Sequence, residues 1–429
     1  MIKYFYKLIY KYISIYIRPE DSLLEIDPVE NYINENYTNK DVLLTKNKNI
    51  NYDELRSKNF DYILLNGNIH YERDIQDFLF NLKNLCNTNT RIMITYFSTL
   101  WKPLIVFATW MGFRRKNIET NWIAHEDISN LLLLTDYEVV RIENKILIPF
   151  YLPILSHLLN RYISPLPFFR NFNMVNILIA RPILKIDNSK MSVSIVVAAR
   201  NEEGNIKNIL DRIPKMGPND ELIFVEGNST DNTWQKIQDL SKEYSSKLNI
   251  ITAQQSGKGK GDAVRKGFSL ASKEILMILD ADLTVPPEDL PRFYNAIVSG
   301  KGEFINGSRL VYPMEKEAMR FFNLLGNKFF AMAFSYVLGQ RFKDTLCGTK
   351  VITLKNYQKL EKNRNYFGEF DPFGDFDLIF GAARMGLKIV EVPIIYRERT
   401  YGETNISRWK HGVILLAMLI FSARKIKFI

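Results

Sequence analysis

The chain of 429 residues is long enough for two or three folded domains, and 46% hydrophobic and 24% charged residues are ordinary contents for a globular protein. Two cysteines and four histidines exclude a disulfide scaffold, argue against a His/Cys zinc site and fit a reducing compartment. The net charge of +10 suits an anionic partner: a phosphate-rich substrate, a membrane surface or nucleic acid. We expect no nucleic acid, because no motif for binding it is present.

The first residues, Met1–Ile13, intersperse lysines with aromatic and aliphatic side chains, which breaks up any signal-peptide core. We predict a helix that packs on the first domain, with a helix lying on a membrane surface as the alternative. No apolar run in the chain reaches the ~20 residues needed to cross a bilayer.

Short apolar runs alternate with helical patterns up to about residue 188. The predicted buried strands are Ser22–Ile26, Tyr62–Leu65, Arg91–Thr95, Glu138–Val140 and Val175–Ala180, with helical segments such as Asp74–Leu85 between them. This alternation predicts a mostly parallel α/β sheet. The polar stretch Lys185–Lys190 then marks a boundary, so we place the first domain at residues 1–188.

The first domain resembles the class I S-adenosylmethionine methyltransferases, which are Rossmann-like. The resemblance is carried by Phe60–Leu65, the helix near Asp74, Arg91–Thr95, and the closing strands Tyr137–Val140 and Val175–Ala180. Where that family has a glycine-rich turn after its first strand, this chain has Pro28 and Val29, which cannot let the backbone approach a cofactor closely. We predict a degenerate, non-catalytic domain that does not use S-adenosylmethionine. The alternatives are a working methyltransferase and a module that docks partners or membrane.

Beyond residue 190, each predicted strand ends in a polar loop. Val193–Ala198 leads into Arg200, Asn201 and Glu202, Glu221–Val225 into Glu226, Asn249–Thr252 into Gly257–Gly267, and Ile275–Leu279 into Asp280 and Asp282. Parallel strands bring such loops to one sheet edge, where open α/β sheets bind ligands. Alternate strand residues share a face, so Asp280 and Asp282 can point together and need a cation or ligand between them. A pair of solvated loop aspartates is the alternative.

The glycine-lysine loop Gly257–Gly267 fits neither the P-loop pattern nor the dinucleotide-binding pattern. Its Lys258, Lys260 and Arg265 can nevertheless close over an anionic ligand. A mobile surface loop is the alternative.

In this order, these elements resemble a family-2 glycosyltransferase with the GT-A fold, over about residues 191–425. The motifs are Arg200-Asn201-Glu202, Glu226–Thr233, Gly257–Gly267, Asp280-Ala281-Asp282, Gly307-Ser308-Arg309, Asp344–Lys350, Asp375-Phe376-Asp377, Glu391-Val392-Pro393 and Arg399–Thr404. The Asp344–Lys350 and Arg399–Thr404 segments are most similar to those of dolichyl- or polyprenyl-phosphate hexosyltransferases. We place this domain at residues 189–405.

The resemblance implies a nucleotide-sugar donor, a UDP- or GDP-hexose, whose diphosphate is held by Mg²⁺ or Mn²⁺ on Asp280 and Asp282. Such a metal prefers oxygen ligands and offsets the charge of the leaving diphosphate. The residues implied along the nucleoside are Asn201, Glu202 and Glu226, and Arg200, in the same motif as Asn201 and Glu202, is a further substrate-binding candidate. Two departures are Glu226-Gly227, where many relatives have two aspartates, and Thr284, where some relatives have an amide metal ligand.

The acceptor distinguishes two mechanisms. A sugar hydroxyl needs a general base, for which Asp377 is the first candidate and Asp375 the second. A lipid phosphate is already ionised near neutral pH and needs cations instead, for which Arg309, Lys350 and Arg399 are suited. We favour the phosphate, because all three cations lie inside matching motifs; surface salt bridges are the alternative.

Two apolar segments, Met319–Leu338 and the basic C-terminal residues 406–429, are predicted either to lie in a membrane interface or to pack as core helices. The expected protein is an inverting glycosyltransferase, cytoplasmic and peripherally associated with the inner face of a membrane. It would transfer a hexose to polyprenyl phosphate. A glycan hydroxyl acceptor and a bifunctional methyltransferase–glycosyltransferase are the alternatives.

Overall fold

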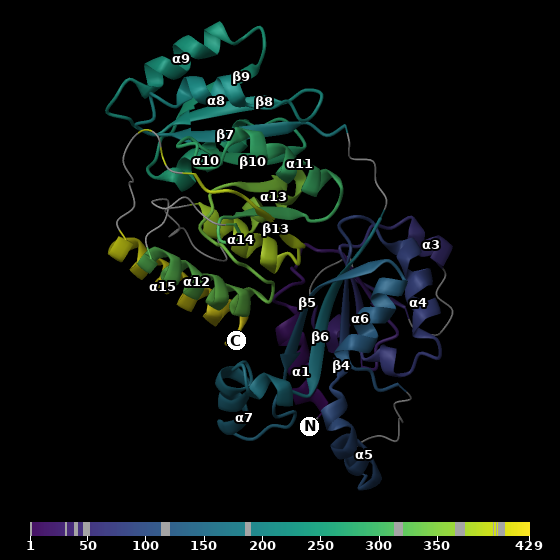
Figure 1. Cartoon of the computed structure of the whole chain (residues 1–429). Coiled ribbons are helices and arrows are strands. Elements are labelled where there is room, and N and C mark those ends of the chain that lie inside the picture. Colours follow the sequence, from purple (N-terminus) through teal and green to yellow (C-terminus); the bar gives the residue numbers. More distant parts are fainter. Residues whose placement is uncertain are drawn as a thin grey trace. The chain divides into compact units, whose positions relative to one another are not determined.

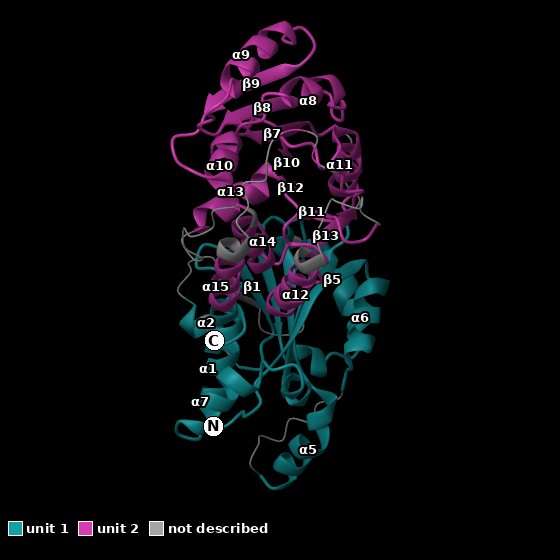
Figure 2. Cartoon of the chain, turned by 60° about the vertical axis from the view of Figure 1, so that its left-hand side comes forward, with its two compact units in different colours: residues 1–185, 423–429 teal, residues 186–422 magenta. Residues whose placement is uncertain are grey.

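The computed structural model describes residues 2–30, 32–37, 42–45, 52–112, 121–184, 190–312, 321–364, 374–397, 399, 401 and 408–429. The chain forms two compact units (Figure 2): unit 1 comprises residues 1–185 and 423–429, and unit 2 comprises residues 186–422. The predicted boundary at residue 188 and most of the predicted linker lie outside the described residues. The C-terminal segment 406–429, which we predicted to be separate, is divided between the two units.

Unit 1 is built on a six-stranded sheet with the order β2-β1-β3-β4-β6-β5. Figure 1 labels β4, β5 and β6 of this sheet. The strands are β1 (Leu23–Ile26), β2 (Val42–Thr45), β3 (Tyr62–Asn66), β4 (Arg91–Phe97), β5 (Tyr137–Lys145) and β6 (Val175–Pro182). Pairs from β2 to β4 are parallel, whereas β6 is antiparallel to both β4 and β5. All five predicted strands are present. The edge strand β2 was not predicted.

Short helices and turns surround this sheet. They are α1 (Ile2–Ile13), α2 (Tyr32–Asn36), α3 (Tyr52–Arg56), α4 (Ile75–Leu82), α5 (Lys102–Trp110), α6 (His125–Leu134) and α7 (Leu155–Leu158). Helix α1 buries Leu8, Ile9 and Tyr12 in the core and leaves Lys3 and Lys7 exposed, which confirms the predicted packed helix.

The last residues of the chain are anchored in unit 1 by a buried ionic cluster. The Nζ of Lys427 lies 3.3 Å from Glu143 Oε1, and Arg141 and Lys145 each approach the same carboxylate to 2.9 Å. Burial lowers the pKa of Lys427 to about 8, against the opposing effect of Glu143. The pKa of Glu143 is held well below its usual value, because these three cations outweigh its burial.

Unit 2 is built on a seven-stranded sheet with the order β13-β11-β12-β10-β7-β8-β9. The strands are β7 (Val193–Ala199), β8 (Glu221–Glu226), β9 (Asn249–Gln254), β10 (Ile275–Asp280), β11 (Phe304–Ser308), β12 (Lys350–Thr353) and β13 (Ile389–Pro393). The four strands from β10 to β9 are parallel, as predicted. Strand β12 is antiparallel to both β10 and β11.

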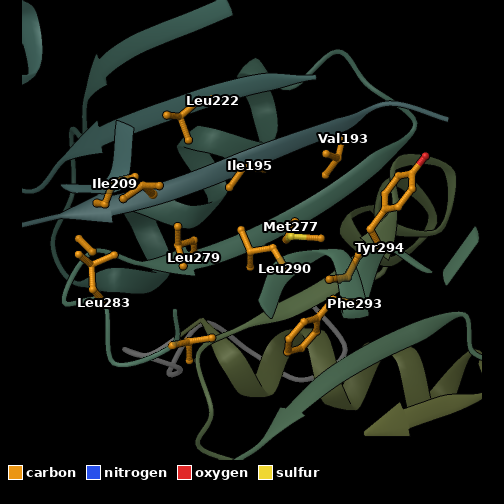
Figure 3. Close-up of a cluster of buried hydrophobic side chains, with 14 of the residues drawn as sticks. Val193, Ile195, Ile209, Leu222, Met277, Leu279, Leu283, Leu290, Phe293 and Tyr294 are labelled. Carbon is orange, nitrogen blue, oxygen red and sulfur yellow. The ribbon is translucent and has the colours of Figure 1, made fainter. Parts of the chain in front are cut away.

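The α-helices that follow β7 in the chain are α8 (Ile206–Arg212), α9 (Thr233–Glu243), α10 (Lys260–Leu270), α11 (Leu290–Val298), α12 (Phe321–Leu338), α13 (Leu354–Lys362), α14 (Asp375–Arg384) and α15 (Arg408–Ile426). Figure 3 shows part of the core, in which Ile195 of β7 and Met277 of β10 face Leu290 of α11. No helix among the described residues is long and apolar enough to cross a membrane.

Helix α10 packs against β7 through a glycine. A Cβ added at Gly267 would overlap the side chain of Val196, so only glycine permits this approach. The close packing fixes the start of α10, and therefore Lys260, relative to the sheet.

We predict that Gly267→Ala lowers the free energy of unfolding of unit 2 by about 1–3 kcal/mol, because it overpacks this contact. Gly326→Ala is the matched control: Gly326 lies inside α12 with nothing within 4 Å of an added Cβ. The control should gain about 0.5–1 kcal/mol from helix propensity. Urea unfolding measures both, and equal midpoints for the two variants would contradict the packing argument.

Candidate active site

Polar loops meet at the carboxyl edge of the unit 2 sheet. Glu226, the last residue of β8, pairs with Ala199 of β7, and Asp280, the last residue of β10, pairs with Ala198. Because these strand ends lie in register, the loops that follow them begin at one edge. The structure thus brings the loops carrying Glu202, Glu226, Asp280 and Asp282 to one place.

Asp280 lies in strongly cationic surroundings. The Nζ of Lys260, at the start of α10, is 2.5 Å from Asp280 Oδ1. Burial acts to raise the pKa of Asp280, but the charges of Lys260, Lys350 and Arg309 outweigh it and hold that pKa below its usual value. Gly348 packs over the ion pair, since a Cβ there would overlap both Asp280 and Lys260.

Asp282 is held by a cation from a distant part of the chain. Arg399 Nη2 donates to Asp282 Oδ2 at 2.7 Å, and the backbone N and hydroxyl of Thr284 donate to Asp282 Oδ1 at 3.1 and 2.8 Å. Arg399 Nη1 also lies 3.5 Å from Glu202 Oε1. One guanidinium therefore links the loop after β10 to the loop after β7.

Glu202 is a buried carboxyl with an altered proton affinity. Burial raises the pKa of Glu202 to about 7, although Arg399 and a hydrogen bond from Asn205 Nδ2, at 2.7 Å, act to lower it. The ring of Tyr401 packs against Gly204, where an added Cβ would lie 2.6 Å from Tyr401 Cδ2. The segment carrying Arg399 therefore lies against the β7 loop.

The residues expected at the nucleoside shape their own loops. Asn201 has a left-handed φ of 57°, and its Oδ1 accepts from Thr230 N at 2.8 Å. Glu226 is 2% exposed and accepts from the backbone N of Ser229 and from Gln254 Nε2. Arg200 is exposed beside these loops.

The cations expected at the acceptor have partners that the sequence did not reveal. Arg309 Nε and Nη2 donate to Asp344 Oδ2 and Oδ1 at 2.6 and 2.8 Å, and its guanidinium lies 5.1 Å from the centre of the Tyr396 ring. The Nζ of Lys350, whose side chain is buried, donates to the backbone O of Cys347. The fork of Arg309 is thus engaged by Asp344, a residue of the Asp344–Lys350 motif that had no assigned role.

Asp377 does not join the ion pairs around Asp280 described above. It accepts from Arg364 Nε and Nη2 at 3.1 and 2.9 Å and lines a small pocket between α10, α13 and α14. Arg265 lines the same pocket, whereas Lys258 is exposed in the turn before α10. The side chain of Asp375 lies outside the described part of the chain.

The donor set at Asp280 and Asp282 fits a hard divalent cation, because it consists of carboxylate oxygens at a strand end. No cluster of three or more His, Cys, Asp or Glu side chains is found among the described residues. A metal here would take its remaining ligands from substrate or water. Lys260 and Arg399, which now neutralise the two carboxylates, would then be available to phosphate oxygens.

Comparison with known families shows which proteins this domain resembles. Residues 194–365 match the family model described as Glycosyl transferase family 2. This part of unit 2 is therefore similar to family-2 glycosyltransferases. The match includes Asp280 and Asp282 and ends before the Arg399 segment.

Curated relatives are similar to this chain over about half of its length. A dolichol-phosphate mannosyltransferase from Pyrococcus furiosus is 32% identical over 50% of this chain. The matched region spans only 59% of that relative's own length. A dolichyl-phosphate hexose transferase from Haloferax volcanii is 27% identical over 52% of this chain and 90% of its own length. A solved structure, glucosyl-3-phosphoglycerate synthase from Mycobacterium tuberculosis, is 19% identical with a TM-score of 0.40, over 57% of this chain and 85% of that one. That last likeness is too distant to assign a role to any residue.

We predict that Glu202 makes the stability of the ligand-free chain depend on pH. Its folded-state pKa of about 7 exceeds its usual value of 4.5, so its contribution is fully present below pH 4.5 and is lost as the pH rises through 7. The loss amounts to at most about 3 kcal/mol. Glu202→Gln should remove it in urea unfolding measured between pH 4.5 and 8.

Glu243→Gln, at the exposed end of α9, is the control and should unfold with the pH dependence of the unaltered chain. An identical pH dependence for Glu202→Gln and the unaltered chain would contradict the assignment.

Proposed function

We propose that the protein is a glycosyltransferase that moves a hexose from a UDP- or GDP-sugar to polyprenyl phosphate. The observation that carries the proposal is the pair Asp280 and Asp282 at the end of β10, each held by a cation, within the region that is similar to family-2 glycosyltransferases. The names of the curated relatives, which include a polyprenol monophosphomannose synthase from Mycolicibacterium smegmatis, support the lipid phosphate as acceptor.

The donor diphosphate would bind at Asp280 and Asp282. When bound there, Mg²⁺ or Mn²⁺ would offset the negative charge that develops on the leaving diphosphate. Lys260 and Arg399 then exchange their carboxylate partners for phosphate oxygens, which keeps every charge in the site compensated. Glu202 keeps Arg399 within reach during this exchange, because its Oε1 lies 3.5 Å from Nη1, the other arm of the guanidinium.

A phosphate acceptor needs positive charge rather than a base, and the site supplies it. The charges of Lys350 and Arg309 both act to lower the pKa of Asp280, which supports placing these two cations near the donor carboxylate. Asp344 fixes the orientation of Arg309, so its contribution is a positioned charge. Asp377, the candidate base for a hydroxyl acceptor, is paired with Arg364, which supports the phosphate over the glycan. We propose inversion by direct displacement at the anomeric carbon.

A lipid acceptor also requires the protein to reach a membrane, and we propose peripheral association with its inner, cytoplasmic face. Helices α12 and α15 support this proposal. Both are rich in apolar residues and leave large side chains exposed: Leu325, Phe329 and Met332 on α12, and Val413, Leu416 and Ile420 on α15. The choice of the inner face rests on the resemblance alone.

For unit 1, the proposal is a degenerate methyltransferase-like domain. Its strand order and the reversed strand β6 agree with that resemblance. The turn after β1 contains Asp27, with a left-handed φ of 39°, followed by Pro28, and the side chain of Val29 lies near Gly67. The turn therefore lacks the glycine backbone that the cofactor's ribose and methionine portion would approach.

We predict that Asp280→Asn and Asp282→Asn each lower product formation about a hundredfold or more, because they remove the charge that holds the metal and diphosphate. The measurement is formation of lipid-linked sugar in detergent, with UDP- and GDP-sugars screened against undecaprenyl and dolichyl phosphate. Chelation should abolish activity, and Mg²⁺ or Mn²⁺ should restore it.

Asp239→Asn, an exposed change on α9, is the matched control and should leave turnover unchanged. Full activity of both active-site variants would overturn the proposed role of the carboxylates. Transfer to a glycan hydroxyl, with none to lipid phosphate, would overturn the proposed acceptor.

We also predict that S-adenosylmethionine does not bind the full chain, because the turn at Pro28 and Val29 cannot accommodate it. A ligand that binds the folded state raises the melting temperature, so thermal unfolding with and without S-adenosylmethionine should coincide. A concentration-dependent rise would instead indicate a working methyltransferase domain.

A further inference from the structure

Unit 1 exposes an unusual concentration of large apolar side chains in two segments, residues 100–111 and 150–172, which we call the apolar rim. The exposed members are Leu100, Leu104, Val106, Phe107, Trp110, Met111, Phe150, Tyr151, Leu152, Ile154, Leu155, Leu158, Tyr162, Phe168, Phe169 and Phe172. Trp110 is 78% exposed and Ile154 is 76% exposed. Scattered apolar residues are normal on a surface, but a concentration of this kind marks a binding surface.

The two segments of the apolar rim lie at the same end of unit 1 (Figures 1 and 2). Trp101 Nε1 donates to the backbone O of Phe172 at 2.8 Å, so the base of one segment is fixed to the end of the other. The start of α1 packs against the second segment, because the Tyr4 hydroxyl donates to Ser156 and the Tyr4 ring packs edge-on against Tyr151. Three parts of the chain far apart in sequence thus build one surface.

Buried polar side chains, rather than apolar packing, hold much of the second segment in place. Asn160 Oδ1 accepts from the backbone N of Leu147 and of Ile148, and Asn173 Nδ2 donates to the backbone O of Asn144 and of Ser164. These hydrogen bonds order the backbone of the segment, while most of its large apolar side chains stay exposed. Those side chains remain outside on a fixed framework.

The charge of this surface is one-sided. Residues 1–19, 78–118 and 144–186 contain no aspartate or glutamate, and these stretches supply the whole rim and the helix beside it. Lys3, Lys7, Lys102 and Arg170 are exposed there. Lys11 shows how closely the cations gather: burial lowers its pKa, and the positive charges of Arg161 and Lys7 lower it further.

We propose that the apolar rim of unit 1 docks into the interface of a bilayer that contains anionic lipid. Aromatic and aliphatic side chains enter the headgroup region, and basic neighbours bind anionic headgroups, so a surface with both properties fits a membrane. A protein partner would need acidic residues placed opposite each cation, whereas an anionic bilayer supplies that charge everywhere. The inference extends the proposed function, because a lipid acceptor is what requires such a surface.

The test is flotation of the full chain with vesicles of phosphatidylcholine, with and without phosphatidylglycerol. The unaltered chain should float with the anionic vesicles, and added salt should weaken the binding. Two double variants test the rim: Phe107→Ser/Trp110→Ser and Phe168→Ser/Phe169→Ser. Each should weaken the apparent affinity for the vesicles about tenfold or more, since each removes aromatic surface that the bilayer would cover. Leu133→Ser/Leu134→Ser is the matched control, because this exposed pair on α6 lies outside the rim.

Three results would overturn the proposal: no flotation of the unaltered chain, equal flotation of the rim variants, or a concentration-dependent dimer that the rim variants abolish without any vesicle binding. Equal flotation would assign membrane binding to other surfaces, such as α12 and α15. Unchanged melting temperatures show that the rim variants fold.

Failure of this proposal can be distinguished from failure of the proposed function. In detergent, the rim variants should transfer sugar to lipid phosphate at the rate of the unaltered chain. Asp280→Asn should lose transfer and still float.

Discussion

Neutralisation of carboxylates at one sheet edge is the constraint on which the rest of unit 2 depends. The buried strand β10 brings Asp280 to the same edge as Glu202 and Asp282, and three carboxyl groups so placed oppose one another's ionisation. Lys260 and Arg399 resolve the conflict, Lys260 from the start of α10 and Arg399 from the segment after β13. Both cations must lie close to the carboxylates to neutralise them. Close contacts at three glycines allow this: Gly267 against Val196, Gly348 against Asp280 and Lys260, and Gly204 against Tyr401. Each allows an element that carries or covers a charge to come near the edge.

Much of this site could be predicted from the sequence, because it depends on where strands end. The apolar run before Asp280 and the polar residues after β7 and β8 are local signals, and the parallel order of the strands places them together. The ion pairs between these carboxylates and their cations could not be predicted. Arg399 binds Asp282 across 117 positions of sequence, and no local pattern encodes that contact. For the same reason, Asp344 and Arg364 were missed as partners of Arg309 and Asp377.

The two units use polar groups in different ways. Unit 2 gathers buried charge at the carboxyl edge of its sheet, and unit 1 gathers it in the cluster around Glu143. In unit 1, buried amides such as Asn160 and Asn173 satisfy backbone groups of an irregular segment, and their hydrogen bonds replace the apolar contacts that would otherwise order it. Sequence patterns identified the central strands of unit 1 but said little about residues 146–173, because order there comes from side chain to backbone bonds rather than from periodic burial.

The buried contact between Lys427 and Glu143 has a topological consequence. Since residues 423–429 belong to the compact unit that also contains residues 1–185, the chain leaves unit 1 once and returns to it after unit 2. Cleavage between the halves would leave the tail held to the first unit by its ionic cluster. Conversely, a fragment ending near residue 188 would lack one of the three cations around Glu143. Separating the two units therefore requires two cuts in the chain, one after residue 185 and one after residue 422.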